Sequence, residues 1–272
     1  MKKLIITDLD DTLYSWIEFF IPAFYEMVDC ISKITGIKSN ILLQEYKNVH
    51  QIYGSVEYPF ATLQLPSIKE KYANCSDSEI KDILGEAFHR FNSYRKHNLR
   101  LYPEVYNTLN MLYQKGIKII GYTDSTQENA FYRLKRLEID SLFEKIYLSY
   151  SSFQGVDSIS KLEKLEFVST KKPDPDTLLQ ICNRENMSVE DVVYIGDSLT
   201  KDIYMAHCAG IESIWVNYGN VQPEMYNKLV AISHWTQEDF SREQEIKRKC
   251  SELNIKPNYV INNFKQVLDI VL

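Results

Sequence analysis

The chain has 272 residues, of which 44% are hydrophobic and 25% charged, values that are ordinary for a globular protein of one large or two modest domains. Its net charge of −6 argues against a nucleic-acid partner, because phosphate backbones are held by clustered Lys and Arg. Five cysteines without a CxxC pair favour a reducing compartment. The apolar stretches are too short for a signal peptide or a membrane span, so we expect a cytoplasmic protein with no membrane partner.

The first predicted element is a short buried strand that ends in acidic residues. The apolar run that starts at Leu4 leads directly into Asp8, with Asp10 two positions later and Thr12 two further on. Because the strand is ending there, the two carboxylates can diverge around one small volume. Two acids at one spot repel each other unless they share a proton or a cation. One carboxylate can then act as nucleophile or metal ligand while the other carries a proton.

Residues 14–103 are expected to form an all-helical insert. Apolar residues recur along its first part at the i+3 and i+4 spacing of a helix. Ser76 and Glu79 have the spacing of a capping box, which predicts a helix start. The segment 54–66 is expected to be irregular. The predicted helices cover 16–35, 39–53 and 76–96.

From Pro103 onwards the pattern changes to alternating helices and strands, which builds a doubly wound parallel sheet. Ser125 and Glu128 again have the spacing of a capping box. No element is assigned to 149–169, and an extra helical stretch at about 220–256 has no functional interpretation. The predicted helices cover 103–116, 125–137, 174–185, 201–209 and 264–271, and the predicted strands cover 117–121, 145–148, 192–195, 212–216 and 259–261.

Residues suited to phosphoryl chemistry stand at several strand ends of this predicted sheet. Thr123 ends one apolar run, and Asp197 and Asp202 follow another. Between them, Lys171 and Lys172 precede two prolines at a predicted helix start. In doubly wound sheets, sites form at the carboxyl ends of strands near the switch in strand order. One crevice can therefore collect these residues together with the acids of the first strand.

In the order acid–acid, hydroxyl, lysine, acid–acid, these segments resemble the four motifs of the haloacid dehalogenase (HAD) superfamily. The resemblance covers the core segments, about two-thirds of the chain. It implies a Rossmann-like α/β core, residues 1–13 and 104–272, with an all-helical cap domain inserted at 14–103. Asp11 and Asp124 occupy positions that are often Gly and Asn in such sequences, and neither substitution puts catalysis in doubt.

The resemblance also implies a role for each catalytic candidate. Asp8 would be the nucleophile that forms an aspartyl-phosphate. Asp10 would be the acid that protonates the leaving oxygen and then the base that activates water. Thr123 would offer its hydroxyl and nearby backbone N–H groups to the phosphoryl oxygens. Lys172, immediately before a proline, matches the family's lysine better than Lys171 and would neutralise charge on the phosphoryl group and on Asp8.

The implied cofactor is Mg²⁺, a hard cation suited to oxygen ligands. By the same resemblance, Asp8, the backbone carbonyl of Asp10, and Asp197 would hold it. Asp202 lies five residues after Asp197, about one turn into the following helix, where it would either ligate the metal directly or orient a water or the lysine.

Together these features predict a Mg²⁺-dependent phosphatase acting on a small phosphorylated metabolite. Dehalogenases and phosphonate-cleaving members of the superfamily lack an Asp at the position of Asp10, which disfavours both. Two alternatives stay open: a phosphosugar mutase, which would need a bisphosphate activator and retain the phosphoryl group, and a catalytically idle interaction module on the same fold. The sequence identifies neither the substrate nor the oligomeric state.

Overall fold

The computed structural model describes residues 2–149, 164–218 and 222–272. The chain divides into two compact units, which we call the core unit and the cap unit. The core unit comprises Met1–Ser15, Arg100–Asn220 and Glu243–Leu272, and the cap unit comprises Trp16–Leu99 and Val221–Arg242. Within the described residues, no helix combines the length and apolarity needed to cross a bilayer.

The core unit is built on a parallel sheet of seven strands in the order β4-β3-β2-β1-β5-β6-β7. From β1 the chain adds three strands on one side and then crosses over to add three on the other. The switch in strand order therefore lies at β1, between β2 and β5, where doubly wound sheets place their sites. This confirms the predicted fold class. The strands are β1 (Leu4–Thr7), β2 (Lys118–Thr123), β3 (Lys145–Ser149), β4 (Leu165–Val168), β5 (Val192–Gly196), β6 (Glu212–Val216) and β7 (Tyr259–Ile261).

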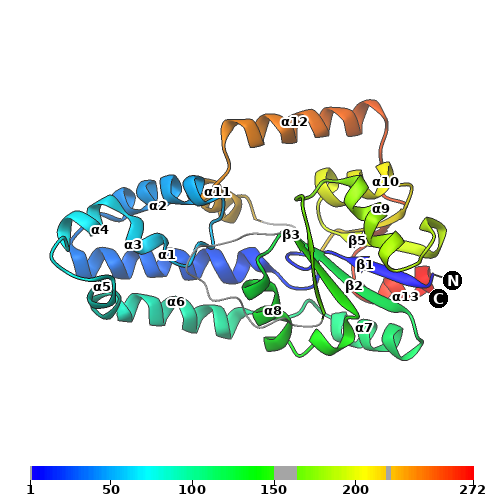
Figure 1. Ribbon diagram of the computed structural model, residues 1–272, viewed down its shortest axis with the longest axis horizontal. Helices are drawn as coiled ribbons and strands as arrows, with labels where there is room; N and C mark the ends of the chain where they lie inside the picture. The colour runs from blue at the N-terminus through cyan, green and yellow to red at the C-terminus, as the bar shows by residue number, and fades with distance from the viewer. Residues whose placement is uncertain (1, 150–163, 219–221) are drawn as a thin grey trace. The chain divides into compact units, whose positions relative to one another are not determined.

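Helices cover both faces of this sheet, with α9 and α10 on one face and α7 and α8 on the other (Figure 1). Alternate strand residues such as Ile6 and Tyr194 pack against Leu178 and Ile181 of α9 in one buried apolar cluster. On the opposite face α7 contacts both β2 and α13. The helices of the core unit are α7 (Val105–Gln114), α8 (Gln127–Arg136), α9 (Pro175–Arg184), α10 (Tyr204–Cys208) and α13 (Val267–Val271). A further helix, α12 (Gln237–Glu252), begins in the cap unit and continues into the core unit from Glu243.

Three details of the core unit differ from the sequence-based expectations. Pro103 lies in a turn before α7 instead of in its first turn, and Glu104 precedes the helix with a φ of +66°. The predicted capping box at Ser125 is wrong, because the side chain of Thr126 accepts the capping hydrogen bond from the backbone N–H of Asn129. The unassigned stretch 149–169 contains the short edge strand β4, and its residues 150–163 lie outside the described ones.

The regular elements described in the cap unit are all helices, and α1 packs against α2, α6 and α11. The Ser76/Glu79 capping box forms as predicted. The helix expected beyond it is interrupted at Leu84, which separates α5 from α6. The segment expected to be irregular contains the short helix α3. The helices are α1 (Trp16–Thr35), α2 (Ser39–Tyr53), α3 (Ala61–Gln64), α4 (Pro66–Lys71), α5 (Asp77–Ile83), α6 (Gly85–Asn98) and α11 (Pro223–Ile232).

Residues 222–242, which the sequence assigned to the core, belong to the cap unit because α11 packs on α1 and α2. The Tyr25 hydroxyl donates a hydrogen bond to the carbonyl oxygen of Lys228 at 3.0 Å. The buried ring of His50 donates from Nδ1 to the carbonyl oxygen of Ile232 at 2.7 Å. The cap unit is therefore assembled from two separate stretches of the chain, and the extra helical stretch contributes to its packing.

Candidate active site

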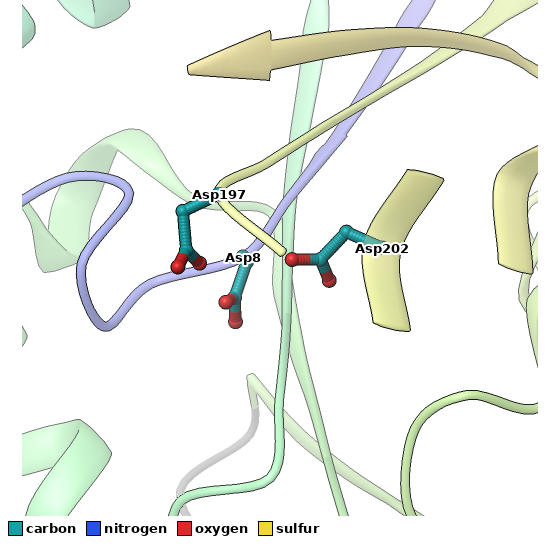
Figure 2. Close-up of side chains that lie close together, drawn as sticks. All are labelled: Asp8, Asp197 and Asp202. Atoms are coloured by element: carbon teal, nitrogen blue, oxygen red, sulfur yellow. The ribbon is translucent and has the colours of Figure 1, made fainter. Parts of the chain in front are cut away.

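Three aspartates gather where β1 and β5 end. Asp8 and Asp197 each come directly after their strand, and Asp202 lies in a π-helical turn, Leu199–Ile203, that leads into α10. One carboxylate oxygen from each of the three lies within 4.8 Å of the others, and Figure 2 shows the side chains converging. Because β1 and β5 are adjacent and parallel, their carboxyl ends meet at the same edge of the sheet. Single π-turns inside helices occur frequently at functional sites.

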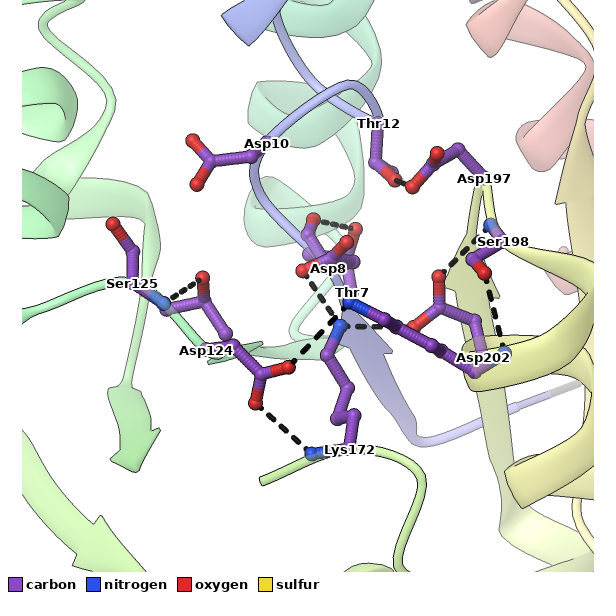
Figure 3. Close-up of polar contacts among 12 residues, drawn as sticks. Thr7, Asp8, Asp10, Thr12, Asp124, Ser125, Lys172, Asp197, Ser198 and Asp202 are labelled. Atoms are coloured by element: carbon purple, nitrogen blue, oxygen red, sulfur yellow. Dashed lines mark hydrogen bonds and ion pairs between the residues drawn. The ribbon is translucent and has the colours of Figure 1, made fainter. Parts of the chain in front are cut away.

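Lys172 is buried between two of these carboxylates. Its Nζ lies 2.8 Å from Oδ1 of Asp8 and 2.8 Å from Oδ1 of Asp202, as the dashed lines in Figure 3 show. Its backbone N–H donates to Oδ1 of Asp124 at 3.0 Å. Asp124 comes directly after β2, so this bond ties the loop that carries Lys172 to the end of a central strand.

Asp202 is held in place by donors on both carboxylate oxygens. The Tyr194 hydroxyl donates to Oδ1 at 2.9 Å, and the Ser198 backbone N–H donates to Oδ2 at 3.0 Å. Gly196 leaves the room for this arrangement, because a Cβ there would lie 2.4 Å from Cγ of Asp202. At such a distance one of the two residues would have to shift, so the glycine where β5 ends leaves Asp202 in this position.

The site carries an excess of negative charge. Burial raises the pKa of Asp8 well above its usual range, a rise that the neighbouring Lys172 opposes. Burial, followed by the charges of Asp202 and Asp11, raises the pKa of Asp197 to about 8. Burial by itself lowers the pKa of Lys172, but Asp202 and Asp8 outweigh it and raise that pKa. A bound cation would relieve this repulsion.

The residues present fit a hard divalent cation. Carboxylate and carbonyl oxygens are the ligands that Mg²⁺ prefers, and Asp8 and Asp197 supply them beside the loop that carries Asp10. The Thr12 hydroxyl donates to Oδ1 of Asp197 at 3.4 Å, and the Trp215 indole donates to its backbone carbonyl at 2.7 Å. Two hydrogen bonds, one to its side chain and one to its backbone, thus hold Asp197 in place.

Asp10 and Thr123 stand apart from the three converging carboxylates. Figure 3 shows the Asp10 side chain turned away from Asp8. Its Oδ1 lies 2.8 Å from a guanidinium nitrogen of Arg133 on α8. Thr123 is the last residue of β2, is buried, and accepts a hydrogen bond from the Ser125 backbone N–H at 3.1 Å.

Sequence reasoning missed Arg133 and Tyr194. Arg133 occupies the buried face of α8 together with Ala130 and Leu134, so a charged residue stands at an apolar position of an amphipathic helix. That mismatch is the signal that could have found it. Tyr194 lies inside the apolar run of β5, where an aromatic residue is ordinary, and the sequence carries no signal for its contact with Asp202.

Comparison of the sequence with known proteins finds matching family models and related phosphatases. The family model for haloacid dehalogenase-like hydrolases matches residues 2–210, and a second, HAD-hydrolase-like model matches 169–267. Glyceraldehyde 3-phosphate phosphatase of Methanopyrus kandleri is 26% identical over 82% of this chain and 87% of its own. Phosphoglycolate phosphatase of Mannheimia succiniciproducens is 31% identical over 56% of this chain and 61% of its own.

Solved structures share the fold. A 2-haloacid dehalogenase from Pseudomonas syringae superposes with a TM-score of 0.60 at 19% identity, covering 100% of this chain and 98% of that one. A Bacillus subtilis HAD-hydrolase bound to magnesium gives a TM-score of 0.56 at 15% identity, covering 99% and 98%. The family predicted from the four motifs is confirmed by the family model over residues 2–210 and by the phosphatase relatives, not by the structures: the chain belongs to the haloacid dehalogenase-like hydrolases, on their phosphatase branch.

Proposed function

We propose that the protein is a Mg²⁺-dependent phosphatase that hydrolyses a small phosphorylated metabolite through an aspartyl-phosphate on Asp8. The observation that carries the proposal is the buried Lys172 ammonium, which lies 2.8 Å from both Asp8 and Asp202, two of the three converging aspartates. A lysine held against a carboxylate nucleophile supports phosphoryl chemistry, because it neutralises the charge of the incoming phosphoryl group. Hydrolysis of phosphate monoesters is among the slowest uncatalysed reactions, so the required rate enhancement must combine this effect with a nucleophile, an acid and a metal ion.

In the first step a carboxylate oxygen of Asp8 bonds to phosphorus while the bond from phosphorus to the leaving oxygen breaks. The electron pair of the broken bond stays on the leaving oxygen, which takes a proton from the Asp10 carboxyl. In an in-line displacement the attacking and leaving oxygens lie on opposite sides of phosphorus. The divergence of Asp10 from Asp8 supports this division of roles (Figure 3).

In the second step the Asp10 carboxylate takes a proton from a water whose oxygen attacks phosphorus. The bond between phosphorus and Asp8 breaks, and its electron pair returns to the Asp8 carboxylate. Inorganic phosphate leaves, and Asp10 is protonated again. Lys172 offsets the charge beside Asp8 throughout, and Thr123 and the backbone beyond it are suited to hydrogen-bond the phosphoryl oxygens.

Asp8, Asp197 and the backbone carbonyl of Asp10 would hold the Mg²⁺. When bound, the ion supplies positive charge to the phosphoryl oxygens. Both oxygens of Asp202 already accept hydrogen bonds. We therefore assign Asp202 the task of orienting Lys172, in preference to direct ligation of the metal.

The substrate class is proposed from the named relatives, which act on glyceraldehyde 3-phosphate and phosphoglycolate. Both are small phosphorylated carbon compounds. A panel of such esters, assayed with Mg²⁺ for release of inorganic phosphate, tests the proposal. We expect at least one member to be hydrolysed by the wild type and none by Asp8→Asn. Transfer of the phosphoryl group to a second position of the substrate, without release, would instead identify a mutase.

A further inference from the structure

The buried arginine of α8 contacts the residue to which we assign proton transfer. Arg133 Nη1 lies 2.8 Å from Oδ1 and 3.0 Å from Oδ2 of Asp10. The same nitrogen donates to the Ser125 hydroxyl at 3.0 Å. The Arg133 side chain is only 2% exposed, whereas that of Asp10 is 25% exposed. A buried guanidinium therefore holds a carboxylate that is itself open to solvent on one side.

Burying a guanidinium costs free energy unless the group is paired with an opposite charge. A buried charge loses its hydration, and the loss is offset only by close opposite charge and hydrogen bonds. Arg133 satisfies this condition with Asp10 and Ser125, both in loops that follow the central strands β1 and β2. A charge-assisted contact from one nitrogen to both oxygens draws the carboxylate toward Arg133. The contact thus ties the loop after β1 to the helix after β2.

We propose that Arg133 is a positioning residue for Asp10: it holds the carboxyl turned away from Asp8, where in-line transfer requires the proton donor to be. The inference rests on the proposed function. Its geometric basis is that the nucleophile and the leaving oxygen lie on opposite sides of phosphorus, so the acid cannot point where Asp8 points. Figure 3 shows the two carboxyl groups diverging in this way.

Two substrates that differ in their leaving group separate a positioning role from a merely structural one. An alkyl phosphate needs a proton on its leaving oxygen, whereas dinitrophenyl phosphate expels a weakly basic phenolate that needs none. The ratio kcat/KM covers only the steps up to release of the leaving group, which is where Asp10 acts as acid. The ratio of the two kcat/KM values, measured on one preparation, is also independent of the fraction of enzyme that is folded.

General acid catalysis contributes about 10²–10⁴-fold, so a misdirected acid in Arg133→Gln should lower kcat/KM for the alkyl phosphate by about 10-fold or more. For dinitrophenyl phosphate the loss should stay within about 3-fold, because no acid is needed there. Asp10→Asn should lower kcat/KM for the alkyl phosphate further, and should likewise have little effect on kcat/KM for dinitrophenyl phosphate. In an Asp10→Asn background, Arg133→Gln should add little, since a positioning residue acts through its partner.

The controls keep the inference open to refutation. Arg136→Gln makes the same substitution on the same helix at an exposed position and should leave both substrates unaffected. Should Arg133→Gln fail to fold, Arg133→Lys keeps the charge but not the planar fork, and should give an intermediate ratio. Equal losses for both substrates in the Arg133 variants would overturn the inference. Failure of the wild type to hydrolyse either ester would overturn the proposed function instead.

Discussion

The Lys172 ammonium links Asp8, to which we assign the role of nucleophile, to Asp202, with 2.8 Å to a carboxylate oxygen of each. Asp8 belongs to the end of β1 and Asp202 to the π-helical turn after β5. One side chain from a third loop therefore fixes the distance between two neighbouring strand ends. Any change in this bridge should alter both the stability and the chemistry of the site.

Lys172→Met should destabilise the protein, because it leaves two buried carboxylates without their cation. Removing one partner of a buried ion pair typically costs about 3–5 kcal/mol. Urea unfolding without divalent metal would measure the loss. In the double variant Lys172→Met/Asp202→Asn one uncompensated charge is gone, so we expect it to be more stable than the single variant. A double variant with the summed losses of the two single variants would contradict the coupling.

Divalent metal should stabilise the folded protein as well as support turnover. A ligand that binds only the native state adds about 2.7 kcal/mol when present at 100 times its dissociation constant. We expect Mg²⁺ to raise the melting temperature of the wild type, EDTA to abolish turnover, and Asp197→Asn to lose most of the thermal shift. Full turnover in chelator would contradict the metal assignment.

Gly196→Ala should impair the site without removing any functional group. The added Cβ would lie 2.4 Å from Cγ of Asp202, so that carboxylate must move, and the Lys172 bridge with it. We expect a loss of kcat of about 10-fold or more, since small misplacements of catalytic groups cost up to 10². Gly85→Ala is the matched control, because nothing lies within 4 Å of its added Cβ. Equal activity of the two variants would show that Asp202 tolerates displacement.

Acidification should weaken the cap unit through His50. Burial lowers the pKa of this side chain from 6.5 to about 4 in the folded protein. Between pH 6.5 and about pH 4, His50 is protonated in the unfolded chain but neutral in the folded protein. The free energy of unfolding therefore falls as the pH drops below 6.5. From pH 7.5 to pH 5 the expected loss is about 2 kcal/mol.

His50→Gln isolates this contribution from every other titrating group. The amide can still donate to the carbonyl oxygen of Ile232 but does not titrate in this range. Urea unfolding of both proteins at the two pH values gives the comparison. On acidification from pH 7.5 to pH 5 we expect the wild type to lose about 2 kcal/mol more stability than the variant. Parallel pH dependence in the two proteins would rule out His50 as the cause.

The sequence predicted the positions that follow directly from strand ends. Asp8 and Asp197 each follow an apolar run, and the rule that sites form at the switch in strand order brings them together. Contacts set by tertiary packing were not predictable in this way. The contact of Lys172 with Asp202 joins residues on different elements, and the family resemblance offered it only as one of several roles for Asp202. The edge strand β4 is too short and too exposed to give a clear apolar pattern.

The assembly of the cap unit from two separate segments of the chain shows a second limit of prediction from sequence. The apolar positions of α11 indicate a face that must be buried, but such a pattern does not say against which helices. The structure buries this face on α1 and α2, far earlier in the chain. Arg133 illustrates the converse, because a charged residue on an apolar helix face marks a contact whose partner the sequence leaves open.

Detection of the phosphorylated intermediate tests the central claim most directly. Rapid acid quenching after mixing with dinitrophenyl phosphate and Mg²⁺, followed by proteolysis and mass spectrometry, would locate any phosphoryl group on the chain. We predict that it lies on Asp8, accumulates in Asp10→Asn because water is no longer activated, and is absent from Asp8→Asn. Near-normal turnover by Asp8→Asn, or a phosphoryl group on another residue, would contradict the mechanism.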